Sequence, residues 1–108
     1  MEKAKEVVSS IQALGQPSNA FQADVTNPDQ AKGLIEGVIK EFGQLHILVN
    51  NVGKYYHKDL SELSPEEWTS TLDINLNGAF YCSKYALGHM QGQGYGRLVN
   101  MASAGVEQ

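Results

Sequence analysis

The chain has 108 residues, 42% of them hydrophobic, and a formal net charge of −4 at pH 7. This length suits one domain with a modest core; the scattered lysines give no electrostatic case for binding nucleic acid, and no apolar run is long enough to span a membrane. The single cysteine, Cys82, excludes an internal disulfide and fits a reducing compartment, and the first residues lack the apolar core of a signal peptide, so we expect a cytoplasmic protein.

The start of the chain predicts one helix and one strand. Residues 2 to 14 carry apolar side chains at helical spacing, and Gly15 and Pro17 close this pattern. Residues 20 to 25 then have the composition of a short strand. A helix followed by a strand is the first unit of an alternating α/β pattern.

A second helix begins with a strong set of local signals. Asn27 is an amide cap, Pro28 lies in the first turn, and Gln30 follows three residues after the cap. Gly43 stops the helix. The predicted buried stripe of this helix comprises Ala31, Leu34, Ile35, Val38, Ile39 and Phe42.

Two further predicted strands end in polar side chains. Residues 46 to 50 form a mainly apolar run, which fits a strand covered on both faces, and Asn51 and Gly53 follow it. Residues 97 to 101 repeat this arrangement, with Ser103 shortly after them. Open α/β sheets bind ligands at the carboxyl ends of their strands. The amides and the hydroxyl at these two strand ends therefore suggest one shared site.

A long helix is predicted over residues 65 to 90. Ser64 and Glu67 form a capping box at its start. Asn75 and Gly78 are poor helix formers in its middle, so we expect a kink or local irregularity there. The stripe along this helix includes Trp68, Leu72, Leu76, Phe80, Ser83, Leu87 and Met90.

Together these elements predict an α/β fold in a single domain over residues 1 to 108. Helices and strands alternate in the order α-β-α-β-α-β. Such an order implies a parallel sheet, here of about three strands, with helices packed on it. No internal repeat or low-complexity linker interrupts the pattern.

Four motifs in this sequence resemble the short-chain dehydrogenase/reductase family. They are the Asp24-Val25 pair, LVNNVG over residues 48 to 53, Asn75-Leu76-Asn77-Gly78, and GRLVNMAS over residues 96 to 103. Val52 stands where the family usually has alanine. The resemblance implies a truncated Rossmann-like domain, NAD or NADP as the cofactor, and hydride transfer between that cofactor and a carbonyl or alcohol substrate.

The resemblance also implies an unusual sheet. Members of the family order their strands 3-2-1-4-5-6-7, and this chain resembles only the part that holds strands 3, 4 and 5. Strands 3 and 4 are not neighbours in that order, so the strand at residues 20 to 25 would keep unpaired edges, which is costly. Either this strand moves beside residues 46 to 50, or another chain fills the gap.

Two residues resemble members of the family's catalytic set. Asn75 resembles the asparagine that holds a water in a proton relay, a role that suits an amide because it donates and accepts without titrating. The alternative is an asparagine that caps or kinks its helix. Ser103 resembles the serine that hydrogen-bonds the substrate carbonyl or hydroxyl, and the alternative is a serine that turns the chain after a strand.

Five residues resemble cofactor-binding positions. Asp24 and Val25 resemble the pair beside the adenine ring, with Asp24 bonding the exocyclic amine; the alternative is a turn that leads into the next helix. Asn51, Val52 and Gly53 resemble the backbone that passes the adenosine ribose. Glycine there allows close approach of a ligand, and the alternative is an ordinary turn.

Other elements of the family pattern do not occur in these 108 residues. The sequence contains no Thr-Gly-x-x-x-Gly-x-Gly loop, and none of its five tyrosines has a lysine four residues later. The three histidines lack a catalytic-triad context and do not form a metal set with the single cysteine. Two hypotheses remain: an oxidoreductase sequence that is inactive as this isolated piece, and a non-catalytic α/β module that self-associates.

Self-association is expected, and the alternative is a monomer in which the stripe of residues 65 to 90 is wholly internal core. A sheet of three short strands covers only part of the apolar surface of three helices, so large patches should remain and seek a partner. In the family that the sequence resembles, the helix equivalent to residues 65 to 90 lies in a subunit interface. We therefore expect a homo-oligomer, most simply a dimer, formed through this helix.

Overall fold

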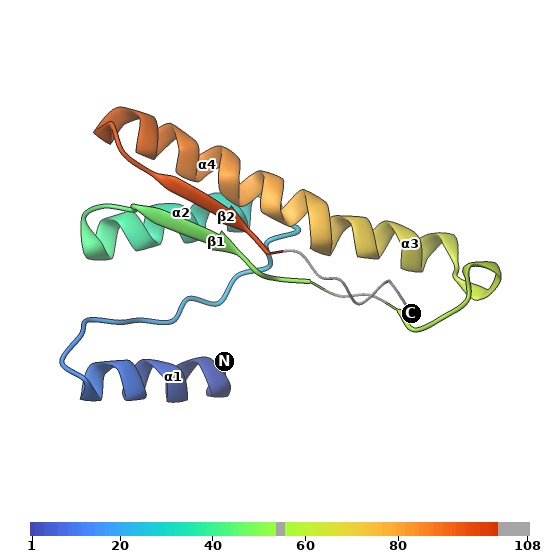
Figure 1. The fold of residues 1–108 in the computed structure, drawn as a ribbon, viewed down its shortest axis with the longest axis horizontal. Coiled ribbons are helices and arrows are strands. Elements are labelled where there is room, and N and C mark those ends of the chain that lie inside the picture. Colours follow the sequence, from blue (N-terminus) through green and yellow to red (C-terminus); the bar gives the residue numbers. More distant parts are fainter. Residues whose placement is uncertain (54–55, 102–108) are drawn as a thin grey trace.

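The computed structural model describes residues 1–53 and 56–101 and shows helices packed beside a small parallel sheet (Figure 1). The elements are α1 (Glu2–Ala13), α2 (Pro28–Phe42), β1 (Ile47–Asn50), η1 (Leu60–Glu62), α3 (Pro65–Leu72), η2 (Asp73–Asn77), α4 (Gly78–Gln93) and β2 (Arg97–Asn100). This confirms the α/β class. No helix in the described ranges is long and apolar enough to cross a membrane.

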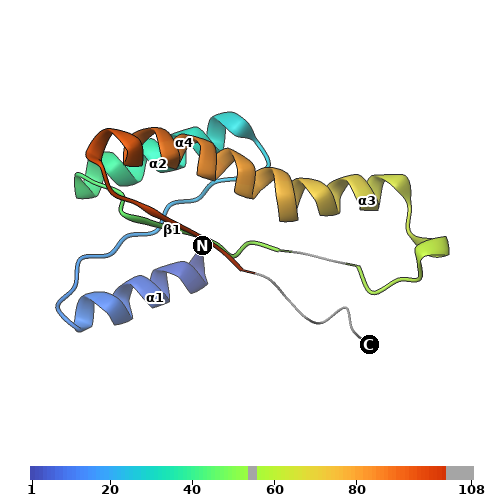
Figure 2. The ribbon, with the colours of Figure 1, turned by 45° about the horizontal axis from the view of Figure 1, so that its top comes forward.

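The strands β1 and β2 are neighbours and run parallel, from the pair Ile47 and Arg97 to the pair Asn50 and Asn100. Helices α2 and α4 lie side by side along one face of this sheet, and α1 lies on the other side, at the end of an extended segment (Figures 1 and 2). The carboxyl ends of β1 and β2 therefore meet at one edge, as the sequence predicted.

The predicted strand at residues 20 to 25 is not formed. In the described ranges the sheet has two strands rather than about three, and residues 20 to 25 do not move beside β1. Backbone donors of this region bond to side chains instead: Asp24 N–H donates to Gln30 Oε1 at 2.8 Å, and Thr26 N–H to Asp24 Oδ1 at 3.0 Å. Without an adjacent strand, side-chain oxygens take the place of strand partners for these two backbone donors.

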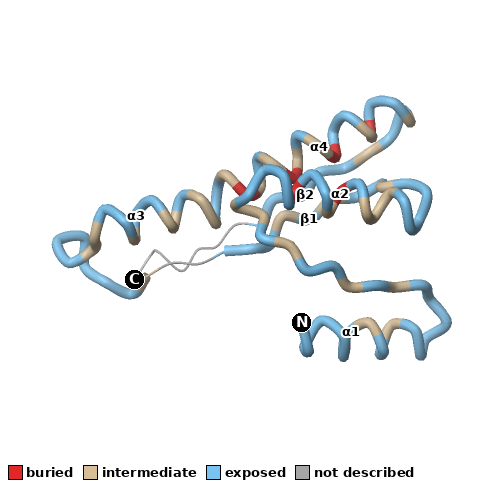
Figure 3. Tube along the Cα trace, turned by 180° about the vertical axis from the view of Figure 1, so that it is seen from behind, coloured by how far each residue is buried: buried red, intermediate tan, exposed pale blue. Residues whose placement is uncertain are grey.

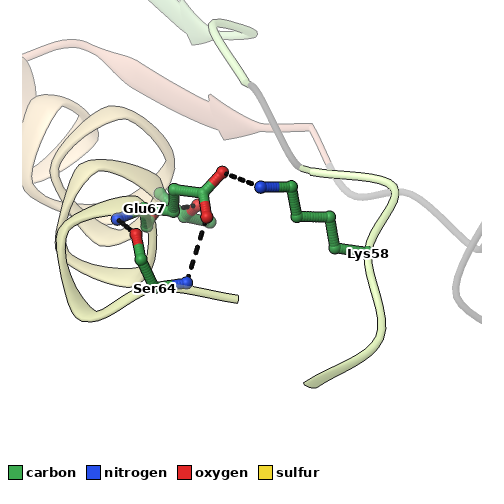
Figure 4. A network of polar contacts seen from close by, with 4 residues as sticks. Lys58, Ser64 and Glu67 are labelled. Carbon is green, nitrogen blue, oxygen red and sulfur yellow. Dashed lines mark hydrogen bonds and ion pairs between the residues drawn. The ribbon is translucent and has the colours of Figure 1, made fainter. Parts of the chain in front are cut away.

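The predicted helix ends are confirmed. Asn27 Oδ1 accepts the backbone N–H groups of Asp29 and Gln30 at 2.9 and 3.1 Å, and Gly43 ends α2 with φ 86°. Ser64 and Glu67 form the capping box of α3. Figure 4 shows that Lys58, from the preceding loop, extends this network, with Nζ 2.8 Å from Glu67 Oε2.

The long helix predicted over residues 65 to 90 is interrupted where the poor helix formers lie. Its first part is α3 and its last part is α4, and between them the five residues of η2 form a π-helical turn. Turns of this kind often occur at functional sites. Asn77 Nδ2 donates to Asp73 Oδ1 at 2.7 Å across the turn, so η2 is tied by its own side chains.

The core of the molecule is small and lies between α2 and α4 (Figure 3). Its buried apolar members are Ala31, Ile35, Cys82, Ala86 and Met90. Burial raises the pKa of the Cys82 thiol, so this cysteine stays protonated. The Cα radius of gyration is 16.1 Å, against about 13 Å for a compact domain of this length, so the chain is extended.

Candidate functional site

The edge where β1 and β2 end is held together by side-chain amides. Asn50 Nδ2 lies 2.9 Å from Asn100 Oδ1 on the neighbouring strand and 3.1 Å from Ser83 Oγ on α4. The backbone N–H of Met101 donates to the carbonyl of Asn50 at 3.1 Å. Asn50 therefore stabilises the strand pair and connects it to α4.

The loop after β1 meets the π-helical turn. Gly53 lies so close to Asn75 that a Cβ on Gly53 would be 2.8 Å from Asn75 Oδ1. The other end of the same amide donates from Nδ2 to the carbonyl of Thr71 at 2.9 Å. The structure thus brings together Asn75 and Gly53, the last residue of the predicted segment of Asn51, Val52 and Gly53, although the two are more than twenty residues apart in the sequence.

Asp24 is engaged in a local turn. Its Oδ1 accepts hydrogen bonds from the hydroxyl of Thr26 at 2.6 Å and from the Thr26 N–H at 3.0 Å. These bonds lower the pKa of the Asp24 carboxyl below its ordinary value of 3.8. The turn leads into α2, which is the alternative to a cofactor-binding role that the sequence left open for this residue. The carboxylate is exposed and stays ionised at neutral pH.

Val25 packs on the first turn of α4. A Cβ on Gly78 would lie 2.8 Å from Val25 Cγ2, and the Gly78 residue is buried. Both residues belong to motifs of the sequence, Val25 to the Asp24-Val25 pair and Gly78 to the Asn-x-x-Gly spacing, but nothing in the sequence pairs them. Ser83, which binds Asn50, offered no signal beyond its place in the helical stripe.

The remaining catalytic candidate, Ser103, lies outside the described residues. The described ranges contain no group of three His, Cys, Asp or Glu side chains that could hold a metal ion. The structure thus brings candidate positions together in two places: Val25 beside Gly78 at the start of α4, and Gly53 beside Asn75 in the π-helical turn.

Comparison with known proteins identifies the family of this chain. The family model described as short chain dehydrogenase matches residues 1–108. The chain belongs to the short-chain dehydrogenase family. It is 39% identical over 102 residues to the 3-oxoacyl-[acyl-carrier-protein] reductase FabG of Staphylococcus aureus, a match that covers 94% of this chain and 42% of that protein.

Solved short-chain dehydrogenase structures share the fold. NAD⁺-bound xylitol dehydrogenase matches with a TM-score of 0.91 and 30% identity over 98% of this chain and 42% of that one. The structure of ElxO with NADP bound matches with a TM-score of 0.84 and 33% identity over 95% of this chain and 42% of that one. The chain thus spans about two fifths of the length of these relatives.

Proposed function

We propose that this chain supplies the central part of an NAD(P)-dependent oxidoreductase site. The observation that carries the proposal is the meeting of Asn75, in a π-helical turn, with Gly53 at the carboxyl end of β1. It is supported by 39% identity to an acyl-carrier-protein reductase and by the NAD⁺ and NADP titles of two structural neighbours. The bound nicotinamide cofactor would exchange a hydride with a carbonyl or alcohol substrate.

The residues present fit the adenosine end of such a cofactor. An ionised, exposed Asp24 can accept from the exocyclic amine of adenine, and Val25 beside it offers an apolar contact. Asn51, Val52 and Gly53 are exposed, and Gly53 has no side chain to block the approach of a ribose. Asn75 would orient a water, and Ser103 would hydrogen-bond the substrate oxygen.

This proposal includes low activity for the 108-residue polypeptide on its own. A carbonyl reductase needs a proton donor matched to the developing alkoxide, and no tyrosine here has a lysine four residues later. The glycine-rich turn that holds a pyrophosphate at a helix N-terminus also has no counterpart in the sequence. A cytoplasmic location belongs to the same proposal, because a single cysteine suits a reducing compartment.

The test is a titration of the isotope-labelled polypeptide with NAD and NADP, followed by NMR. We expect weak binding, with amide shifts confined to residues 24–25 and 51–53. The matched control is Asp24→Asn, which keeps the shape of the turn and removes the charge. Absence of any shift at saturating nucleotide contradicts the cofactor role, and robust NAD(P)H oxidation that depends on Asn75 contradicts the low activity.

A second candidate is a non-catalytic module that self-associates. The favouring observation is the apolar stripe of the long helix, whose members Trp68, Leu76 and Phe80 are 53%, 61% and 59% exposed. We infer that a second copy of the chain covers this stripe, as either candidate function allows. A mass measurement in solution tests the association, and the nucleotide titration separates the two functions.

A further inference from the structure

Gly78 stands at a position where glycine is unfavourable for the helix itself. It is the first residue of α4, directly after η2, and both flanking turns are helical. Alanine is preferred over glycine at such positions by helix propensity. The φ of Gly78 is −59°, which any residue adopts, so backbone conformation does not require glycine here.

The contact with Val25 does require it. A Cβ on Gly78 would lie 2.8 Å from Val25 Cγ2, 3.5 Å from Val25 Cβ and 3.5 Å from the Val25 carbonyl oxygen. Only the first of these distances is too short, so the branched side chain of Val25 is the whole obstacle. Because β-branched side chains are stiff at χ1, Val25 cannot swing aside easily.

The backbone of Val25 is also fixed on both sides. Asp24 N–H is bonded to Gln30 Oε1, the hydroxyl and N–H of Thr26 are bonded to Asp24 Oδ1, and Asn27 N–H is bonded to the Asp24 carbonyl. A larger residue at position 78 would therefore push the whole Asp24-Val25 turn away from α4. The turn would move as a unit, because its own hydrogen bonds stay intact.

The geometry points to Gly78 as a positioning residue that sets the distance between the Asp24-Val25 turn and the Asn75 turn. Gly78 follows η2 directly, and Asn75 lies within that turn. Because residue 78 has no side chain, Val25 packs directly against the stretch of η2 and α4 whose Asn75 lies beside Gly53. This inference rests on the proposed function, because the two turns are its adenosine-side and catalytic-side groups.

The contact between Gly78 and Val25 can be tested without a ligand, by enlarging residue 78 and shortening residue 25. Gly78→Ala should lower the melting temperature by about 4–8 °C, the shift that a modest loss of stability produces in a domain of about this size. Gly88→Ala, in the same helix with nothing within 4 Å of its added Cβ, is the matched control and should not lower it. In the Val25→Ala background, Gly78→Ala should cost nothing, because the nearest remaining atoms lie at 3.5 Å. An equal loss in both backgrounds overturns the inference.

Nucleotide binding then separates positioning from plain stability. At a temperature where every variant is folded, Gly78→Ala should weaken NAD binding about tenfold relative to Gly88→Ala. Equal affinities of these two variants overturn the positioning role. If the wild-type polypeptide binds no NAD, the proposed function fails. The melting temperatures of Gly78→Ala, alone and in the Val25→Ala background, still decide whether Gly78 sets the position of the Asp24-Val25 turn.

Discussion

At the scale of single residues, several side chains of the candidate site bond to the protein itself. Asp24 closes a turn with Thr26, and Asn75 bonds to the carbonyl of Thr71 in the preceding turn of its helix. These contacts are the structural alternatives that the sequence allowed for both residues: a turn before a helix for Asp24, and a role within its helix for Asn75. Asn75 nevertheless presents its Oδ1 to Gly53, so its helical bond and a role in the site are compatible.

Gly53→Ala should displace the amide of Asn75. The added Cβ would lie 2.8 Å from Asn75 Oδ1, the end of a side chain that can rotate. The loss in melting temperature should therefore stay below about 4 °C, whereas the NMR signals of the Asn75 side-chain amide should shift. Gly33→Ala in α2, with open space around its Cβ, is the control. Unchanged Asn75 signals would contradict the contact.

Glu67 should make the protein sensitive to acid. The pKa of this carboxyl is lowered below its ordinary value of 4.5, mainly by the hydrogen bond from Lys58 and next by the hydrogen bond from the Ser64 N–H (Figure 4). A carboxyl with a lowered folded-state pKa stabilises the fold above its unfolded pKa, and this stability is lost as pH falls through the folded pKa.

This prediction is tested by measuring how far the melting temperature of each protein falls between pH 6 and pH 3. Glu67→Gln keeps an acceptor for Ser64 N–H and cannot titrate, so it should lose less on acidification than the wild type does. Glu66→Gln, one position earlier in the same first turn, should behave as the wild type. If all three proteins lose the same number of degrees, the pH dependence arises elsewhere.

At the scale of elements, what could be predicted from the sequence was local. Asn27, Ser64 and Glu67 cap their helices through residues two or three positions away, so the pattern alone places these helix starts. An irregularity in the long helix was predictable for the same reason, since Asn75 and Gly78 are poor helix formers, but its π-helical form was not. The strand expected at residues 20 to 25 depended on a distant neighbour, and composition does not show whether a neighbour exists.

The candidate site follows the same division. The sequence placed Asn51 and Gly53 after one strand, and a parallel sheet brought that strand's end beside Asn100. The contacts of Gly53 with Asn75 and of Gly78 with Val25 join segments twenty or more residues apart. Such contacts depend on how the helices pack over the sheet, which motif spacing does not specify.

Gly96→Ala should loosen the junction of α4 and β2. A Cβ at this position would lie 2.5 Å from Met90 Cγ and 2.6 Å from Met90 Cβ, and Met90 is buried in the core. The base of that side chain cannot move without moving α4, so we expect the melting temperature to fall by about 4 °C or more. Gly92→Ala, with nothing within 4 Å, is the control; equal melting temperatures would contradict the packing.

At the scale of the whole molecule, the fold covers too little of its own apolar surface. The accessible surface is 8058 Å², whereas a compact monomer of 11.8 kDa would expose about 5,900 Å². Apolar side chains exposed on the sheet include Ile47 and Val49, and α1 buries none of its residues. The relatives reported above are more than twice as long.

We predict that the purified chain is a dimer at tens of micromolar, associated through the stripe of α3, η2 and α4. Phe80 and Leu87 are exposed along this stripe, and burying them against a second copy removes apolar surface from water. Light scattering should give twice the chain mass for the wild type, and Phe80→Asp or Leu87→Asp should give the monomer mass, because a buried unpaired charge is costly. Val7→Asp, at an exposed position of α1, should remain dimeric, and circular dichroism should show all three variants folded. A monomeric wild type refutes the association, and a dimer that persists in both stripe variants places the interface on another surface.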